Sequence, residues 1–195
     1  DLSHLTYVHG STTGNRAVAE KANLTTEQEG DTVRVTRWME DIEPALAFRE
    51  YGGYKNNIDR WQMSQFIPPV YININNGSVE TGVGADCETR NNGQGKWGFV
   101  VYHAMTPETE TTTHYFWSNA YQIEGKPVTE EMTEMSYKQI FTAFHQDWEV
   151  FNKQQENWDD RPTIDTIQDA GSIAARAMID RMVSEEQGQM AVAAE

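Results

Sequence analysis

The chain has 195 residues, a formal charge of −15 and 38% hydrophobic residues. A domain of this length buries about two thirds of the surface that its unfolded chain exposes. The strongly acidic balance excludes nucleic acid as a partner, because phosphate binding needs a basic face. No apolar run approaches the roughly 20 residues that cross a bilayer, which argues against a membrane protein. The single cysteine, Cys87, favours a reducing compartment, so we expect a cytoplasmic location.

The first segments predict a helical turn, a loop, a strand and a short helix. DLSHLTYVHG predicts one or two helical turns that end at Gly10, and the polar residues 11–31 predict a loop. DTVRVTRWM, at 31–39, alternates two sets of side chains, as a strand does. EPALAFREYGGYKNN, at 43–57, predicts a short helix and a Gly-Gly loop.

The middle of the chain predicts strands, and the last third predicts helices. Residues 59–78 predict one strand with two prolines at an edge or bulge, and residues 96–123 predict a hairpin around TPETET. After residue 132 the apolar period changes from two to 3.6, which predicts a long helix over MSYKQIFTAFHQDWEVFNKQQENW and a final helix after Pro162. We expect residues 188–195 to be a flexible tail. This order of elements is typical of the α+β class.

Asp147 lies on the apolar stripe of the predicted long helix. An ionised carboxylate that faces a core is costly unless a cation or several donors meet it, so Asp147 must be protonated, paired or bound to metal. A salt bridge or a cap is the simpler alternative. His145 points elsewhere on this helix and is expected at the surface. The stripe consists of Ile140, Phe141, Phe144, Trp148 and Phe151.

His4 and His9 stand five residues apart behind Asp1. Side chains five apart diverge on a regular helix, so the two rings converge only if the helix is bulged or ends between them. Two histidines and one buried carboxylate from a distant helix form the facial triad of non-haem Fe(II) proteins. Zinc accepts the same ligands in hydrolases, so the residue types alone leave both metals open.

Several tracts of the chain resemble the catalytic domain of Rieske non-haem iron oxygenases, in particular the vanillate O-demethylase and dicamba monooxygenase group. DLSHLTYVH resembles the second half of the ligand motif of that group, N-x-x-D-x-x-H-x-x-x-x-H. HAMTPETETTTHYFW resembles its signature hairpin, and FHQDWEVFNKQQ is similar to its metal-ligand helix. WMEDIEPALAFREYG and DRWQ add to a likeness that covers nearly all of the chain.

The resemblance implies specific roles for five residues. His4, His9 and Asp147 would ligate Fe(II). Asp1 would match the acid that links a ligand histidine to the Rieske cluster of a neighbouring subunit. His114 would face the pocket and hydrogen-bond the substrate, whereas we interpret His103 as structural.

The resemblance also implies cofactors, partners and an assembly. Residues 1–187 would form the non-haem iron domain of an oxygenase that demethylates or hydroxylates a small aromatic substrate with O₂. A Rieske [2Fe–2S] cluster needs two cysteines and two histidines, so we expect it on an N-terminal domain outside this chain. Electrons would come from NAD(P)H through a reductase or ferredoxin. The full-length protein would be a homotrimer in which each Rieske domain serves the next subunit.

The fold implied by the resemblance is a helix-grip (START/Bet v 1-like), an antiparallel sheet wrapped around a long C-terminal helix. Two alternatives stay open: a metal-free helix-grip protein that binds a hydrophobic small molecule, and a zinc hydrolase. Arg37 and Arg60 would meet a substrate carboxylate, or they are solvated strand residues. The aromatic residues available for a pocket are Trp61, Phe66, Tyr71, Trp97, Tyr115 and Trp117.

Overall fold

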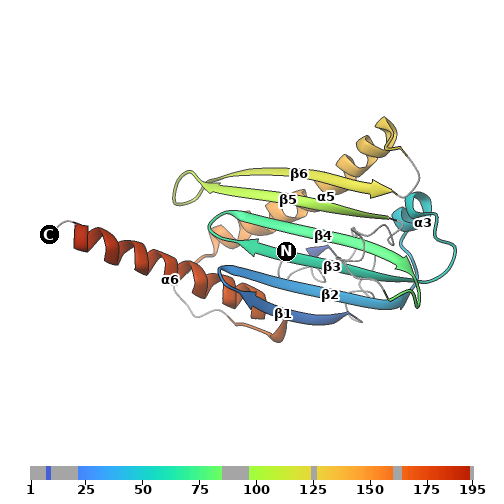
Figure 1. The fold of residues 1–195 in the computed structure, drawn as a ribbon. Coiled ribbons are helices and arrows are strands. Elements are labelled where there is room, and N and C mark those ends of the chain that lie inside the picture. The colour runs from blue at the N-terminus through green and yellow to red at the C-terminus, as the bar shows by residue number, and fades with distance from the viewer. Residues whose placement is uncertain (1–7, 10–21, 85–96, 124–126, 160–163, 194–195) are drawn as a thin grey trace.

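The structure is a computed structural model that describes residues 8–9, 22–84, 97–123, 127–159 and 164–193. Its centre is a six-stranded antiparallel sheet in which each strand pairs with the next along the chain (Figure 1). The strands are β1 (Asn23–Glu29), β2 (Thr32–Ile42), β3 (Ile58–Ile67), β4 (Tyr71–Glu80), β5 (Trp97–Pro107) and β6 (Thr113–Ile123). The α+β class and the predicted hairpin at 96–123 are confirmed.

Two long helices pack on the same face of the sheet. They are α5 (Glu130–Glu156) and α6 (Ala170–Ala193), and a shorter helix, α3 (Leu46–Gly52), lies near one end of the sheet (Figure 1). Phe144 of α5 contacts the ring of Trp117 on β6, whereas α6 packs on β2 and β3. The α6 cluster contains Val33, Val35, Phe66, Ala175 and Met178. A sheet with a long helix on one face agrees with the implied helix-grip.

Alternation along the strands decides which side chains face the helices. On β2, Val33, Val35, Arg37 and Met39 are buried, and the residues between them are half-buried. The antiparallel register continues this face across the sheet, from Val33 through Phe66 and Ile72 to His103 and Trp117. Successive residues point to opposite faces, so the neighbours of these residues lie on the other side.

Two strand predictions were incomplete. Residues 11–31 were expected to be a loop, but Asn23–Glu29 form β1, because they pair along β2 despite their polar side chains. Residues 59–78 were expected to be one strand, but they form β3 and β4 with a turn at Pro68 and Pro69. Proline has no N–H to donate to the ladder, so consecutive prolines end one strand before the next begins.

The predictions of the short helix and of the two long helices hold with shifted boundaries, whereas the helical turns predicted for DLSHLTYVHG lie outside the described residues except at 8–9. The side chain of Thr129 accepts a hydrogen bond from the Met132 N–H and caps α5. The last helix begins at Ala170, after a 3₁₀ turn (Ile167–Asp169) whose Thr166 and Asp169 form a capping box. It continues to Ala193, so part of the tail expected at 188–195 is helical. Among the described residues, no helix is both long and apolar enough to span a bilayer.

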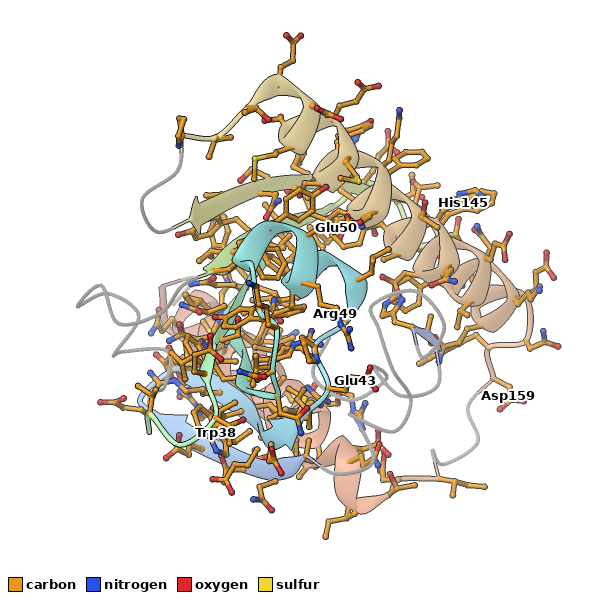
Figure 2. The ribbon with its side chains drawn as sticks, turned by 90° about the vertical axis from the view of Figure 1, so that its right-hand side faces the viewer. Trp38, Glu43, Arg49, Glu50, His145 and Asp159 are labelled. Carbon is orange, nitrogen blue, oxygen red and sulfur yellow. The ribbon has the colours of Figure 1, made fainter. Side chains whose placement is uncertain are left out.

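The apolar stripe predicted for α5 is only partly buried. Phe141, Trp148 and Phe151 are 52%, 60% and 56% exposed, although the sequence predicts that they share a buried stripe with Asp147. The buried residues of α5 are Ala143 and Asp147. The helix therefore turns Ala143, Phe144 and Asp147 to the sheet and leaves much of its other aromatic surface uncovered. His145 is exposed as predicted and points away from the sheet (Figure 2).

Candidate metal centre

The structure brings His9 and Asp147 together from opposite ends of the chain. The Nε2 atom of His9 lies 3.1 Å from the Oδ1 atom of Asp147. Both residues are buried, with 5% and 8% of their surfaces exposed. A buried carboxylate needs a compensating cation or several donors, and His9 is one of the side chains that meet Asp147.

Gln146 determines which nitrogen of His9 faces Asp147 with a lone pair. The Nδ1 atom of His9 lies 3.1 Å from the Oε1 atom of Gln146, an oxygen that can only accept a hydrogen bond. Nδ1 therefore carries a proton, and in a neutral ring Nε2 has a lone pair. Two electron-rich atoms, Nε2 and Oδ1, then lie side by side, which is favourable only if a proton or a metal ion sits between them.

The spacing of the two atoms suits a single metal ion. Nitrogen and carboxylate ligands lie about 2.1 Å from zinc and similar ions, so two ligands at right angles are about 3 Å apart. The predicted third ligand, His4, and Asp1 lie outside the described residues. Among the residues that are described, no group of three or more His, Cys, Asp or Glu side chains converges. The described part of the candidate centre is the His9–Asp147 contact, with Gln146 bonded to the other ring nitrogen of His9.

Replacing Gln146 by leucine is expected to weaken metal binding about 10–100-fold, because partners that orient a ligand histidine contribute this much. His9 would lose the acceptor of its Nδ1 proton but keep its place beside Asp147. Competition with a chelator would measure the metal affinity. The matched control is Gln155→Leu on the exposed part of α5. Equal affinities in the two variants would contradict the orienting role.

His103 is the second buried histidine of this region, and it was interpreted as structural. It is 2% exposed on β5, its Nδ1 bonds the hydroxyl of Tyr115, and its ring packs on Phe144 one turn before Asp147. Burial lowers the pKa of His103 to about 4, although the charge of Asp147 acts in the opposite direction. Burial also raises the pKa of Tyr115, and the charge of Asp147 adds to this effect. The sequence feature that could have drawn attention to His103 is its position as the first residue of the HAMTPETE tract.

The neutral state of His103 predicts a pH-dependent stability. Between pH 6.5, where a free histidine titrates, and about pH 4, the unfolded chain binds a proton that the folded protein does not. The free energy of unfolding should therefore fall as the pH drops through this window, by up to about 3 kcal/mol at ~1.4 kcal/mol per pKa unit. Denaturant titrations across the window should show a shallower slope for His103→Asn than for the wild type. His145→Ala, which removes an exposed histidine, should keep the wild-type slope.

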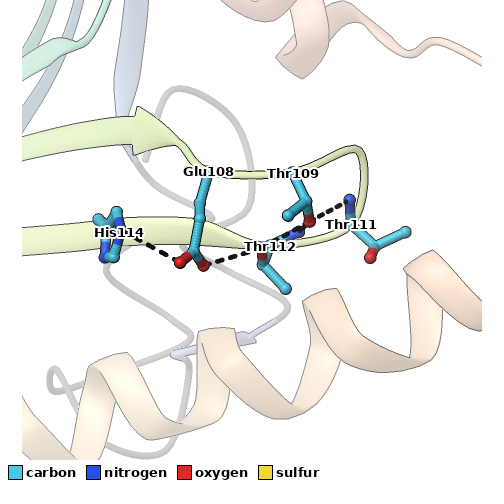
Figure 3. Close-up of polar contacts among 5 residues, drawn as sticks. All are labelled: Glu108, Thr109, Thr111, Thr112 and His114. Atoms are coloured by element: carbon cyan, nitrogen blue, oxygen red, sulfur yellow. Dashed lines mark hydrogen bonds and ion pairs between the residues drawn. The ribbon is translucent and has the colours of Figure 1, made fainter.

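The structure does not bring His114 to the His9–Asp147 pair. His114 lies on β6 beside the exposed hairpin tip, with its Nε2 3.5 Å from the Oε1 atom of Glu108 (Figure 3). It shares a strand face with Phe116, whereas Tyr115 points to α5. The other oxygen of Glu108 accepts a hydrogen bond from the Thr112 hydroxyl. A substrate contact of His114 stays a prediction that this geometry does not support.

A pocket of about 420 Å³, its open mouth included, lies between α3, β5 and the first half of α5. Its walls are mostly aromatic and aliphatic, and none of the lining residues that the structure describes is charged. Of the predicted pocket aromatics, Trp97 lines it, whereas Trp61 faces the other side of the sheet, Phe66 packs under α6 and Tyr71 is exposed. The lining residues are Tyr51, Trp97, Phe99, Met132, Ser136, Gln139 and Ile140.

Arg37 and Arg60 are buried, so the interpretation of solvated strand arginines is wrong. Burial lowers the pKa of each guanidinium to about 10. The guanidinium of Arg60 lies 4.6 Å from the centre of the Phe48 ring, which is a cation–π contact. Near α3, Arg49 pairs with Glu43 on the surface (Figure 2).

Comparisons with known proteins identify the family and the fold of the chain. Residues 1–185 match the model of the family described as "Vanillate O-demethylase oxygenase C-terminal domain". A vanillate O-demethylase oxygenase subunit of Pseudomonas sp. (strain ATCC 19151) is 34% identical, over 95% of this chain and 57% of that protein. One from Pseudomonas sp. (strain HR199 / DSM 7063) is 32% identical, over 96% and 53%. Dicamba monooxygenase bound to 3,6-dichlorosalicylic acid has the same fold, with a TM-score of 0.68 and 14% identity over 96% of this chain and 54% of that one.

The fold and the centre define an α+β domain with a buried histidine–carboxylate pair between its sheet and a long helix. The chain belongs to the family of vanillate O-demethylase oxygenase C-terminal domains, as the sequence resemblance predicted. It spans a little over half the length of these relatives. The metal-free binding protein, kept open from the sequence, is not favoured by this membership.

Proposed function

We propose that the chain is the iron- and substrate-binding domain of a Rieske-type oxygenase that demethylates or hydroxylates small aromatic compounds. The observation that carries this proposal is the buried His9–Asp147 contact in a chain of this family. Two relatives are named vanillate O-demethylase oxygenase subunits, and another is named a toluene-4-sulfonate monooxygenase iron-sulfur subunit. These names support an aromatic substrate and an oxygenase reaction.

In this proposal His4, His9 and Asp147 hold Fe(II). Bound iron would supply the activation of O₂ beside the substrate, including attack on a methyl group attached to oxygen. The role of this chain's own residues is to orient the side chains that would hold the metal and to exclude water. Gln146 keeps the lone pair of His9 Nε2 directed at the metal position, and the burial of His9 and Asp147 keeps bulk water from the pair. A solved relative of the same fold, dicamba monooxygenase, is described with non-heme iron.

The same proposal includes parts that lie beyond the described residues. Asp1 would connect the iron centre to a Rieske [2Fe–2S] cluster of an N-terminal domain. Electrons would reach that cluster from NAD(P)H through a reductase or ferredoxin, in a cytoplasmic homotrimer. Residues 1–187 would form the iron domain. The name of a more distant relative, the oxygenase component of a chloroacetanilide N-alkylformylase, supports a system of several components.

We also propose that His103, and not only His114, meets the substrate. His103 is neutral, buried and on the sheet face covered by α5, and its Nδ1 bonds Tyr115. A neutral imidazole on this face adds no charge near the metal position. His114 would act only if the exposed hairpin tip moved toward the pocket.

Metal loading and product analysis test the proposal. Anaerobic addition of Fe(II) should give one bound iron per chain. The full-length oxygenase with its reductase should then release formaldehyde and a phenol from a methoxylated aromatic compound in the presence of O₂. Release of a hydroxylated ring without formaldehyde would favour hydroxylation over demethylation. Preferential loading with zinc, together with hydrolytic turnover, would overturn the oxygenase assignment.

A further inference from the structure

A tyrosine and a histidine form a hydrogen-bonded pair beside the candidate metal centre. The hydroxyl of Tyr115 lies 2.5 Å from the Nδ1 atom of His103, and the two rings are nearly parallel, with centroids 5.7 Å apart at 12°. Both rings pack on Phe144, which lies one helical turn before Asp147 on α5. Burial lowers the pKa of His103 and raises the pKa of Tyr115, and the charge of Asp147 acts on both groups. The pair is therefore within electrostatic reach of the centre.

This pair has the arrangement that one-electron oxidation of a tyrosine requires. A tyrosine that loses an electron becomes a strong acid, so it is oxidised readily only where a base accepts its phenolic proton. A neutral imidazole has one nitrogen with a lone pair, and a phenol is a better donor than acceptor, so the Tyr115 hydroxyl donates to Nδ1 of His103. Oxidation would move this proton to His103 and leave a neutral tyrosyl radical. The negative charge of Asp147 would stabilise the imidazolium that forms.

Two further oxidisable rings connect Tyr115 to the surface. Trp117 follows Tyr115 by two residues on β6, so both side chains lie on the same face of the sheet. The Phe144 ring lies between them, with centroids 5.7 Å from Tyr115 and 5.2 Å from Trp117. Trp117 in turn stacks on Tyr137 of α5, at 5.4 Å and 27°, and Tyr137 is 53% exposed. A continuous series of ring contacts thus leads from the neighbourhood of Asp147 to solvent.

We propose that Tyr115, Trp117 and Tyr137 form a relay that carries oxidising equivalents from the metal centre to the surface and protects the centre when no substrate is bound. The source of the oxidant rests on the proposed function, because O₂ that reacts at bound iron without a substrate leaves a one-electron oxidant near Asp147. Tyr115 gives this oxidant one electron and gives its proton to His103.

The later steps of the relay restore each side chain. Trp117 gives one electron to the tyrosyl radical of Tyr115, which takes its proton back from His103. Tyr137 then reduces the oxidised Trp117 by one electron and releases its phenolic proton to water. A soluble thiol at the surface returns one electron and one proton to Tyr137. The net reaction is the transfer of one electron from the thiol to the oxidant, with no change in the protein.

Radical formation in the metal-free chain tests the relay. A ruthenium tris(bipyridine) photo-oxidant with a cobalt(III) quencher would remove one electron from exposed rings, and EPR of rapidly frozen samples would identify the radical. Among the described tyrosines, Tyr115 is the one bonded to a histidine, so the radical should migrate inward and give a long-lived tyrosyl signal there. Tyr115→Phe should lose this signal. Deuterium oxide should slow its appearance in the wild type, because a proton moves with the electron.

Two variants distinguish the relay from direct oxidation of Tyr115. Trp117→Phe keeps a ring between Tyr115 and Tyr137, but this ring is much harder to oxidise, so the long-lived signal should form severalfold more slowly. Tyr137→Phe should have the same effect. Tyr71→Phe removes an exposed tyrosine from the opposite face of the sheet and should leave the rate and the yield unchanged. The deuterium effect on the wild type decides even if a variant fails to fold.

Peptide mass spectrometry would connect the relay to the centre. After loading with Fe(II) and exposure to O₂ and a thiol without substrate, Trp117→Phe should accumulate oxidised His9 severalfold faster than the wild type, and Tyr71→Phe should match the wild type. Equal oxidation of His9 in Trp117→Phe and the wild type would overturn the protective role.

Three results in the metal-free chain would overturn the relay itself: a long-lived tyrosyl signal that survives in Tyr115→Phe, equal rates in Trp117→Phe and the wild type, or no deuterium effect. A chain that binds no iron would overturn the proposed oxygenase and the protective role with it. The radical measurements would still decide whether the relay exists, because they need neither metal nor turnover.

Discussion

Asp147→Ala is expected to lower the affinity for iron by more than about 100-fold and to abolish oxygenase turnover. The substitution removes the only acidic side chain that contacts His9 among the described residues. Loss of a direct ligand should exceed the 10–100-fold effect of losing an orienting partner. Metal analysis after anaerobic loading and gel filtration would measure the iron content. His9→Ala should have an effect of the same size, because both side chains meet at one point.

The control for this prediction is on the same helix. His145→Ala removes an exposed histidine whose Nε2 atom lies 3.8 Å from the Oε1 atom of Glu149. The iron content should not change, because this side chain points away from the candidate centre. Circular dichroism would show whether each variant keeps its helices. Normal iron in a folded Asp147→Ala protein would contradict the assignment of the centre. Asp147→Asn keeps the shape of the side chain but removes its charge, and intermediate iron retention would separate the two contributions.

Gly77→Ala is expected to be the most destabilising small substitution in the sheet. A Cβ atom at Gly77 would lie 1.9 Å from the Cζ2 atom of Trp61, well inside contact distance. Trp61 cannot withdraw, because it is fully buried, stacks on Trp38 and donates its Nε1–H to Asn75. Overpacking of this kind costs about 3 kcal/mol, which would lower Tm by roughly 5–10 °C. Thermal unfolding followed by circular dichroism would measure the shift.

Gly188→Ala is the matched control for the same chemical change. A Cβ atom at Gly188 would meet no atom within 4 Å, and the residue lies inside α6. Alanine has a higher helix propensity than glycine, so this variant should be more stable by up to about 1 kcal/mol. Opposite signs for the two substitutions would show that the ring of Trp61, and not the loss of glycine itself, decides the result at Gly77. Equal effects would contradict that account.

The sequence contained most of the element order. The alternation of side-chain types predicted β2 and the β5–β6 hairpin. The change in the period of the apolar residues after residue 132 predicted α5. It did not predict β1, whose polar side chains have no strand pattern and whose structure depends on pairing with β2. It also merged β3 and β4, because Pro68 and Pro69 were interpreted as an edge or bulge within one strand, whereas they form the turn between two.

The sequence by itself determined the residue types of the centre: an acid on a core-facing position of a long helix and a histidine near the start of the chain. Only the tertiary structure decided that His9 and Asp147 meet at 3.1 Å, that His103 is buried beside them, and that His114 points to the opposite face. Periodicity fixes the face of a residue within its own element. How far apart two elements lie is set by packing between segments far apart in the chain, which no local pattern contains.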